Sequence, residues 1–341
     1  MQVEIPAGAP PNPAIVFETL TAYYRTVALR AAIELDLFRT VGEGPATAPV
    51  LAKRCGASER GIRILCDNLV IIGILAKAGE VYSHTPSSAT FLDPRSPACL
   101  ASIASFLGDT EILTAAQSLS SIVRQGRTIL AGEGTLVPDN PVWVEFARSM
   151  SPMMASMTGP LASIVLHGAL GPVRVLDIAA GHGLFGIEFA IQNTEAQVTA
   201  LDWAQVLEVA LENAQKAGVA ERYKLLPGSA FDVDYGGPYD VVLLTNFLHH
   251  FDVSACVGLL KKVRASMRTG GRAAVLEFVP NEDRVTPPTA AAFSLTMLIT
   301  TPSGEAYTFS ELESMFLESG FTGISAYPLE RTPQTVVIGI A

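Results

Sequence analysis

The hydrophobic positions follow two different spacings, and the change falls near residue 170. Before that point, apolar residues recur every three to four positions, as Val16, Leu20, Tyr23 and Val27 do, which is typical of helices. Beyond it, short apolar runs rich in β-branched residues alternate with helical stretches. The pattern predicts a largely helical first part and an α/β second part.

Residues 13–95 predict several short helices and one hairpin. Gly56 is placed to end a short helix, and Ser58 is a candidate N-cap for the next, whose apolar residues form one stripe. Residues 74–86 then alternate between apolar and polar positions around a turn, as a small hairpin does. Helix, turn, helix and hairpin is the outline of a winged helix, which we assign to a first domain of residues 1–97.

The second domain, residues 98–341, begins with a mostly helical segment and continues with runs that predict strands. The first five runs are typical of strands buried on both faces of a parallel sheet. The runs are residues 173–179, 196–202, 223–228, 239–246, 272–279 and 335–341. Their alternation with helices predicts a doubly wound α/β domain, in which ligands bind beyond the carboxyl ends of the strands.

Composition and charge exclude several classes of protein. Hydrophobic residues make up 49% of the 341 residues and charged residues 16%, so the chain can bury a large core and is not disordered. The chain has 23 Lys and Arg residues and 33 Asp and Glu residues, which gives a net charge of −10. This charge disfavours nucleic acid and anionic membranes as partners.

Cysteine usage and the first residues predict a cytoplasmic protein. The four cysteines are scattered without a C-x-x-C pair, which is typical of reduced thiols in the cytosol. Residues 1–13 have neither the basic nor the apolar region of a signal peptide. The longest uncharged stretch, residues 285–304, is interrupted by prolines and is too short to span a membrane.

A glycine-rich turn with a carboxylate follows the first predicted strand. Asp177 precedes Gly181 by four residues, and Gly183 and Gly186 complete a G-x-G-x-x-G pattern. Nicotinamide and flavin enzymes share that pattern, but their pyrophosphate favours a neutral turn at the helix N-terminus. A carboxylate instead suits a ligand that carries positive charge and hydroxyl groups, such as S-adenosylmethionine. We therefore expect Asp177, Gly181 and Gly183 to bind that cofactor.

The ends of the next strands could contact the same ligand. A carboxylate at the end of the second strand can accept both ribose hydroxyls, and an aromatic ring beside it can pack on adenine, although the carboxylate could equally be a helix N-cap. Residues 228–231 could present backbone groups and a ring to the adenine edge, or form only a tight turn. The candidates are Asp202, Trp203, Ser229, Ala230 and Phe231, together with Asn246 after the fourth strand.

Four segments resemble class I S-adenosylmethionine-dependent methyltransferases: VLDIAAGHG, ALDWAQV, TNFLHHFDVSAC and MRTGGRAAVLEFVP. With the winged helix in front, the chain from about residue 13 resembles the family of plant caffeic acid and bacterial small-molecule O-methyltransferases. The resemblance implies a seven-stranded methyltransferase sheet, a winged-helix dimerisation domain, a homodimer and no metal. The chain departs from the family at Ala179, where glycine is usual, and at Ser229, where many members have aspartate.

Methyl transfer to a phenol requires that a proton be removed, since a phenol with a pKa of about 10 is mostly neutral at pH 7. A histidine, with an ordinary pKa of about 6.5, is suited to that task. By resemblance, His249 falls on the family's catalytic base and Glu277 on the glutamate that orients it. We interpret His250 as an orienting or structural group.

A second glutamate of the family corresponds to Ala306 in this chain, and Glu305 lies beside it. Either the usual histidine–glutamate arrangement is incomplete, or Glu305 substitutes imperfectly for the missing group. The departure leaves room for an acceptor other than a phenol.

Residues 143–157 are rich in methionine and aromatic residues. Met150, Met153 and Met154, together with Met297, could line a pocket for a flat apolar acceptor, because thioethers adapt to aromatic faces. Core packing is the alternative for this stripe. The expected acceptor is a small, largely aromatic molecule.

Three other functions remain open. The enzyme could methylate carbon or nitrogen instead of oxygen. A DNA-binding regulator would use the winged helix, but the candidate recognition helix, residues 58–75, has no basic face. A nicotinamide oxidoreductase fits the spacing from Gly181 to Asp202, but Asp177 and the lack of a Tyr-x-x-x-Lys segment oppose it.

The first domain is also unusually apolar for its length. A domain of about 80 residues cannot bury so many apolar side chains alone, and we therefore expect it to hold a homodimer. The residues on which this expectation rests are Ile33, Leu35, Leu37, Phe38, Ile71, Ile72, Ile74 and Leu75.

Overall fold

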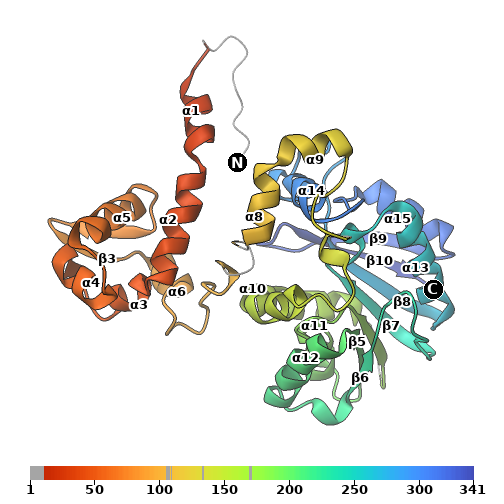
Figure 1. Cartoon of the computed structure of the whole chain (residues 1–341). Helices are drawn as coiled ribbons and strands as arrows, with labels where there is room; N and C mark the ends of the chain where they lie inside the picture. Colours follow the sequence, from red (N-terminus) through yellow and green to blue (C-terminus); the bar gives the residue numbers. More distant parts are fainter. Residues whose placement is uncertain (1–10, 105–107, 109, 133, 169–170) are drawn as a thin grey trace. The chain divides into compact units, whose positions relative to one another are not determined.

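The computed structural model describes residues 11–104, 108, 110–132, 134–168 and 171–341. The first ten residues, on which the signal-peptide expectation largely rests, lie outside the described residues. The chain forms two compact units, residues 1–108 and 109–341 (Figure 1). The expected domain boundary between residues 97 and 98 stays a prediction.

Unit 1, residues 1–108, is mainly helical and carries one small antiparallel sheet. Its sheet has the strand order β1-β3-β2, and β2 and β3 form the predicted hairpin. Gly56 ends α4 in a left-handed conformation, and the Ser58 hydroxyl accepts the N–H of Gly61 at the start of α5. The elements are α1 (Ala14–Thr21), α2 (Tyr23–Glu34), α3 (Leu37–Gly42), β1 (Ala46–Thr47), α4 (Ala48–Cys55), α5 (Glu59–Ile71), β2 (Leu75–Ala78), β3 (Val81–His84) and α6 (Pro86–Phe91).

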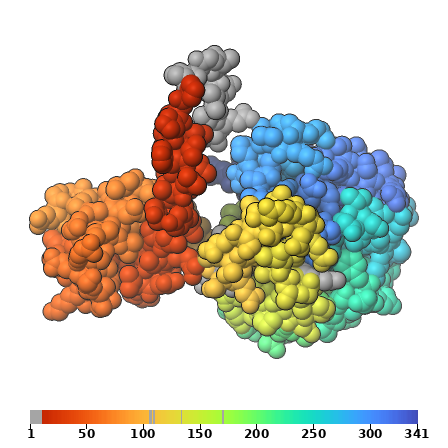
Figure 2. Space-filling model, turned by 45° about the horizontal axis from the view of Figure 1, so that its top comes forward, coloured from red at the N-terminus to blue at the C-terminus, as the bar shows by residue number. Residues whose placement is uncertain are grey.

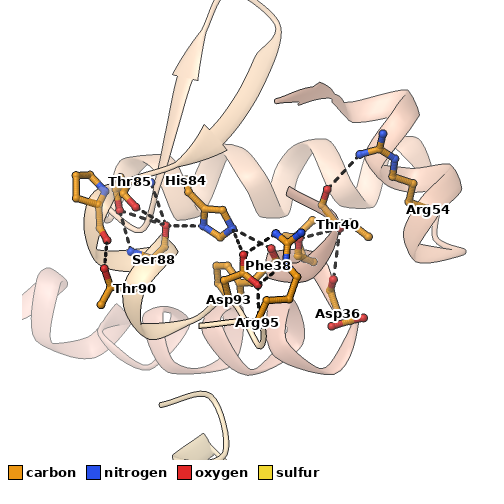
Figure 3. A network of polar contacts seen from close by, with 12 residues as sticks. Asp36, Phe38, Thr40, Arg54, His84, Thr85, Ser88, Thr90, Asp93 and Arg95 are labelled. Atoms are coloured by element: carbon orange, nitrogen blue, oxygen red, sulfur yellow. Dashed lines mark hydrogen bonds and ion pairs between the residues drawn. The ribbon is translucent and has the colours of Figure 1, made fainter. Parts of the chain in front are cut away.

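A partly buried histidine joins three of these elements (Figure 3). His84 Nε2 contacts the carbonyl of Phe38 in α3 at 2.9 Å, and Nδ1 contacts the Ser88 hydroxyl in α6 at 2.9 Å. Because a carbonyl only accepts, Nε2 carries a proton. Asp93 is held nearby by Arg95 through two hydrogen bonds from the guanidinium. This network stabilises unit 1, which gives His84 a structural role.

Of the eight apolar residues expected to need a dimer partner, three are buried in the core of unit 1, four are partly buried against the same core, and one is exposed. Leu37, Phe38 and Leu75 belong to the core, and Ile71, at 80% exposure, is the one strongly exposed member of the set. The helices and the small sheet give the other members a common interior. Exposed apolar side chains lie instead along α1 and the start of α2, which stand out in red from the rest of unit 1 (Figure 2). They are Ile15, Val16, Phe17, Leu20, Tyr23, Tyr24 and Val27.

Unit 2, residues 109–341, contains a seven-stranded sheet in the order β6-β5-β4-β7-β8-β10-β9. The strands are β4 (Arg174–Ile178), β5 (Gln197–Asp202), β6 (Tyr223–Pro227), β7 (Tyr239–Thr245), β8 (Met267–Phe278), β9 (Thr322–Pro328) and β10 (Gln334–Ile340). The first five are parallel, and β10 runs antiparallel to both β8 and β9. The doubly wound architecture predicted from the apolar runs is confirmed.

The helices of unit 2 cover both faces of this sheet (Figure 1). α10 packs with α11 and α12, and α13 packs with α15. The helices are α8 (Thr110–Gln117), α9 (Leu119–Gln125), α10 (Val142–Val165), α11 (Leu184–Gln192), α12 (Ala204–Lys216), α13 (Val253–Ala265), α14 (Pro288–Thr300) and α15 (Phe309–Glu318), with short 3-10 turns at Gly134–Leu136, Ala220–Arg222 and Leu248–His250.

The sheet differs from the prediction in two places. β9 was not predicted, because this edge strand is largely exposed and lacks an apolar run. β8 begins at Met267, five residues before the predicted run, and includes the polar stretch Arg268–Arg272. Among the described residues, no helix is long and apolar enough to cross a membrane.

The strand order reverses beside β4, which lies between β5 and β7. In open α/β sheets, the crevice beyond the carboxyl ends of the strands at such a switch point is the usual ligand site. The carboxyl ends of β4, β5, β6, β7 and β8, with the loops that follow them, carry the predicted cofactor and base residues.

Candidate active site

Asp202 organises the glycine-rich loop that follows β4. One carboxylate oxygen accepts the N–H of Gly181 at 2.8 Å, and the other accepts the N–H of Trp203 at 2.7 Å. Burial raises the pKa of Asp202 to about 6, and the two N–H groups oppose that rise. Each carboxylate oxygen can accept a second hydrogen bond, so the partly exposed Asp202 retains capacity for two hydroxyl donors.

Asp177 lies completely buried at the end of β4. Its Oδ2 accepts the N–H of Gly186 at 3.0 Å, and no described group bonds its Oδ1. Burial raises its pKa to about 7, and the nearby Asp202 carboxylate adds to the rise. Asp177 therefore supports the start of α11, with one oxygen left to accept a further hydrogen bond.

Glycine is suited to two positions of this loop for different structural reasons. A Cβ on Gly183 would lie 2.6 Å from the Tyr223 hydroxyl and 2.8 Å from Cβ of Ala210, so this position is closed by packing. Gly181 has a left-handed φ of 56°, and a Cβ there would meet only a carbonyl at 3.9 Å. Ala179, where the family usually has glycine, also takes a left-handed φ of 54°. Gly181 is thus the glycine whose open side a ligand could approach.

The loop after β6 lies next to Asp202, because the N–H of Gly228 donates to the backbone carbonyl of Asp202. The Ser229 hydroxyl accepts the N–H of Phe231 at 3.1 Å. The Phe231 ring is 40% exposed and meets the ring of Phe251 edge-on, with centroids 4.9 Å apart. Trp203 packs against a small cluster shared by α10 and α12.

His249 and Glu277 meet at the carboxyl ends of β7 and β8. Glu277 Oε2 forms a short hydrogen bond with His249 Nδ1, while Oε1 accepts the N–H groups of Phe247 and Leu248 at 3.0 and 2.8 Å. Both side chains are buried. One carboxylate from β8 therefore fixes both the imidazole and the backbone of the turn that carries it.

Aromatic rings surround His249. The Phe293 ring of α14 meets it edge-on at 4.8 Å, and Phe293 stacks on Phe278 at 4.0 Å. His250 lies against His249 and the Trp143 ring. Burial and the neighbouring His249 lower the pKa of His250 well below its ordinary value, so His250 is neutral at neutral pH.

Glu305, the neighbour of Ala306, does not substitute for the family's second glutamate beside His249. Glu305 forms an ion pair with Arg284 at 2.8 Å, and no contact with His249 is found among the described residues. Ala306 is completely buried. Glu277 is therefore the one carboxylate that bonds His249 in the described part of the chain.

One methionine of the predicted stripe, Met154, contacts a pair of amides, Asn246 and Gln334, that bond each other. Met150 and Met154 are buried on α10, Met153 is partly exposed, and Met297 is buried on α14. Asn246 Nδ2 lies 3.9 Å from Met154 Sδ, and the Asn246 Oδ1 accepts from Gln334 Nε2. Gln334, Phe278 and Phe293 were not predicted, because a polar residue before a strand and aromatic residues in strands and helices are common in structural roles.

Among the residues that the structure describes, no group of three or more His, Cys, Asp or Glu side chains could hold a metal ion. The candidate cofactor, base and acceptor residues all belong to unit 2. Their arrangement places an imidazole whose Nδ1 bonds a carboxylate at the edge of the sheet where two acidic strand ends and a glycine-rich loop also converge.

Comparison with known proteins identifies the family. Residues 145–322, more than half of the chain, match the O-methyltransferase domain, and residues 17–94 match the O-methyltransferase dimerisation domain. The chain belongs to the O-methyltransferase family. It is an S-adenosylmethionine-dependent O-methyltransferase, as the strand ends and the resemblance predicted.

Known proteins match this O-methyltransferase over most of its length. A crystal structure of a candidate O-methyltransferase from Nostoc punctiforme PCC 73102 is 48% identical, with a TM-score of 0.94, and the match covers 97% of this chain and 100% of that one. The tetracenomycin polyketide synthesis 8-O-methyltransferase of Streptomyces glaucescens is 25% identical, and the match covers 96% of each protein. Acetylserotonin O-methyltransferase of Mus musculus is 29% identical, with 86% of this chain and 80% of that protein covered.

These matches bear on the alternatives that the sequence left open. The family match does not favour a DNA-binding regulator, because the winged helix lies within the dimerisation domain. It gives no support to a nicotinamide oxidoreductase or to carbon or nitrogen as the methylated atom.

Proposed function

We propose that this O-methyltransferase methylates a phenolic hydroxyl of a small aromatic molecule, with His249 as the general base. The observation that carries the proposal is the bond between Glu277 and His249 Nδ1. A carboxylate accepts, so Nδ1 holds the proton and the Nε2 lone pair is left to take another. No described group bonds Nε2.

Each residue of the site has a task in this proposal. S-adenosylmethionine, when bound, supplies a methyl group activated by its sulfonium. His249 Nε2 accepts the proton of the acceptor hydroxyl, which makes the oxygen nucleophilic. Glu277 keeps the imidazole in the required tautomer and stabilises it once it is protonated. The rings of Phe278 and Phe293 exclude water around the base.

The chain's residues fit the cofactor. The unpartnered buried oxygen of Asp177 suits a cationic or hydroxyl donor, and Asp202 keeps one acceptor position on each oxygen for the ribose. Gly181, Gly183, Trp203 and residues 229–231 would complete the site. Asn246, a predicted cofactor residue, contacts Met154 and Gln334, and these contacts suit the acceptor side equally well.

The acceptor class follows from the site and the relatives together. Met150, Met153, Met154 and Met297 would provide polarizable contacts to a flat ring. The named relatives include 3-hydroxy-5-methyl-1-naphthoate 3-O-methyltransferase of Streptomyces sahachiroi and a phenazine O-methyltransferase of Lysobacter antibioticus. Both names describe fused aromatic acceptors, which supports an aromatic acceptor here.

The function is tested with matched pairs of acceptors. We expect methyl transfer from S-adenosylmethionine to a panel of naphthols and dihydroxyarenes, measured by mass spectrometry, and no transfer to the amines of identical ring shape. Methylated amines with untouched phenols would contradict an oxygen acceptor. Stabilisation of the enzyme by NAD, but not by S-adenosylhomocysteine, would contradict the cofactor. A ligand at about 100 times its Kd adds about 2.7 kcal/mol, which a thermal shift detects.

We also expect a homodimer held by unit 1. The support is the matched dimerisation domain and the exposed apolar row along α1 and α2. Sedimentation at low micromolar concentration should show a particle of twice the 36.1 kDa chain mass. Replacing Phe17 and Leu20 with Glu should shift it towards monomer, because charges on a buried apolar interface are costly. A wild-type protein that sediments as a monomer would contradict this expectation.

A further inference from the structure

His249 is enclosed in this structure. The residue is 4% exposed, and Met154 and Met297, which would face the acceptor, are equally buried. The Phe293 ring of α14 meets the imidazole edge-on at 4.8 Å. A general base must come within about 3 Å of the hydroxyl whose proton it takes. An acceptor of the size of a naphthol therefore reaches Nε2 only if one of the surrounding elements moves.

The site is bounded by α10, by α14 and by the turn that carries His249, and α14 is the least buried of the three. The turn is bonded to Glu277 in β8. α10 packs against α11 and α12 and buries nine of its 24 residues, whereas α14 buries three of its 13, both helices being described in full. Elements with few buried contacts are those that open locally, which makes α14 the element most able to move.

The end of α14 is fixed by buried contacts. Thr128 donates its hydroxyl to the carbonyl of Ile299 at 2.6 Å and its N–H to the carbonyl of Thr301 at 3.1 Å. A Cβ on Gly304 would lie 2.3 Å from the carbonyl oxygen of His249, so the backbone just after the helix lies directly against the turn of the base. This end of α14 can serve as a pivot, but it cannot swing away from the site.

The chain that enters α14 is exposed, and ionic contacts hold it. Residues 281–285 are all exposed. The guanidinium of Arg284 donates to Glu305 at 2.8 Å and to Glu311 at the start of α15. Glu305 belongs to the fixed side, because its neighbour Ala306 is completely buried. Arg284 thus joins the exposed start of α14 to the fixed segment beyond its end.

We propose that Arg284 is a positioning residue that governs acceptor entry: its ion pairs with Glu305 and Glu311 hold the first half of α14, residues 288–294, closed over the base. When these ion pairs break, this lid pivots about the fixed end of the helix and carries Phe293 away from the imidazole. The inference rests on the proposed function, because it takes His249 as the base that the acceptor must reach. A closed lid also excludes water from the reaction.

Such a latch changes the rates of acceptor binding and release, and it leaves the affinity unchanged. The ion pairs of Arg284 belong to the closed enzyme whether or not an acceptor is bound, so they do not favour one of these two states over the other. A weaker latch raises the open fraction in both states. Entry and exit then accelerate by the same factor, whereas loss of a residue that only shapes the site would raise the Kd.

The first test is stopped-flow binding of 2-naphthol, detected by its fluorescence, to the full-length enzyme saturated with S-adenosylhomocysteine. Arg284→Met should raise the association and dissociation rate constants by about fivefold each, as expected for exposed ion pairs, and leave the Kd within about twofold of the wild type. About 0.5 M NaCl should accelerate the wild type in the same way and the variant much less, because salt screens exposed charges.

Arg268→Met is the matched control. Arg268 lies at the opposite end of β8 from α14 and forms an exposed ion pair with Asp240 at 2.9 Å. Its loss removes the same kind of interaction from the same strand, so it should leave both rate constants at their wild-type values. Any general effect of removing an exposed arginine would appear in both variants.

Variants of the partners test whether the ion pairs themselves form the latch. Glu305→Gln should accelerate both rate constants by about twofold in the wild type and add almost nothing in Arg284→Met, because partners in one interaction are not additive. Arg284→Lys, which keeps the charge but not the fork of donors, should lie between the wild type and Arg284→Met. If Arg284→Met does not fold, the double variant Glu305→Gln and Glu311→Gln removes the same ion pairs from the other side.

Hydrogen exchange tests the lid without any substrate. The amides of residues 289–294 should exchange about fivefold faster in Arg284→Met than in Arg268→Met, because exchange follows the open fraction. The amides of α15 should be unchanged, since α15 lies on the fixed side. Equal acceleration in α14 and α15 would indicate general destabilisation and would overturn the latch.

The outcomes separate failure of this inference from failure of the proposed function. A wild type that binds S-adenosylhomocysteine but neither binds nor methylates any phenol contradicts the proposed function, and hydrogen exchange alone then decides whether Arg284 latches α14. If exchange and both rate constants of Arg284→Met lie within about twofold of those of Arg268→Met, the role of Arg284 is overturned while the proposed function stands. A raised Kd with an unchanged association rate constant also overturns it, because Arg284 would then only support the shape of the site.

Discussion

Replacing His249 with alanine is expected to lower kcat by about 100-fold or more. The alanine variant lacks the Nε2 acceptor that removes the phenolic proton, while the cofactor loops around Asp177 and Asp202 make no bond to His249. The Kd for S-adenosylhomocysteine should therefore change little. The measurement is kcat across pH for a phenol from the acceptor panel.

The pH profile gives this prediction its specific signature. As the assay pH approaches the pKa of the phenol, about 10, the acceptor ionises without help, and the difference between wild type and variant should shrink. His250→Ala is the matched control, because His250 is neutral, bonds the Phe247 carbonyl at 3.2 Å and makes no bond to Glu277. Equal, small losses for the two variants, with no dependence on pH, would make His249 structural.

Replacing Glu277 with glutamine should lower kcat by a comparable factor, about 100-fold, while the fold remains intact. Glutamine can still accept the N–H groups of Phe247 and Leu248 through its carbonyl oxygen. Its amide nitrogen, however, donates to Nδ1 and forces the histidine proton onto Nε2, the atom that must accept. The chain would then hold the imidazole in place in the wrong tautomer.

The alanine variant at the same position distinguishes tautomer control from stability. Glu277→Ala leaves the N–H groups of Phe247 and Leu248 unpaired and should lower the free energy of unfolding by about 2–5 kcal/mol, whereas Glu277→Gln should cost about 1 kcal/mol or less. Urea unfolding measures both. A glutamine variant with wild-type kcat would show that Glu277 acts only on the backbone of the turn.

The sequence predicted the parts of the site that depend on strand ends. The carboxyl ends of parallel strands meet at one edge, so Asp177, Asp202, His249 and Glu277 could be grouped before any coordinates were known. Their side-chain partners could not be predicted in the same way. The burial of Asp177, for example, depends on how closely Gly186 lets α11 approach β4.

Long-range partners escaped the sequence for a related reason. Arg284 lies in a loop after β8 and draws Glu305 into an ion pair, which spacing alone could not reveal. Gln334 reaches Asn246 across β8 because β10 runs antiparallel, and no apolar pattern marks a polar residue that becomes buried. The exposed apolar row of α1 looked like an ordinary helical stripe, since periodicity shows that a helix has an apolar face but does not show what that face contacts.

The anchoring of His249 through β8 affects how acceptor preference can diverge in this family. The proposed base and the backbone of its turn are held by three hydrogen bonds from Glu277 in one strand, so substitutions elsewhere need not disturb them. The methionines that would face the acceptor lie on α10 and α14 instead. If the proposed function holds, natural variation on those two helices exchanges one aromatic acceptor for another while the proposed means of proton removal is inherited unchanged.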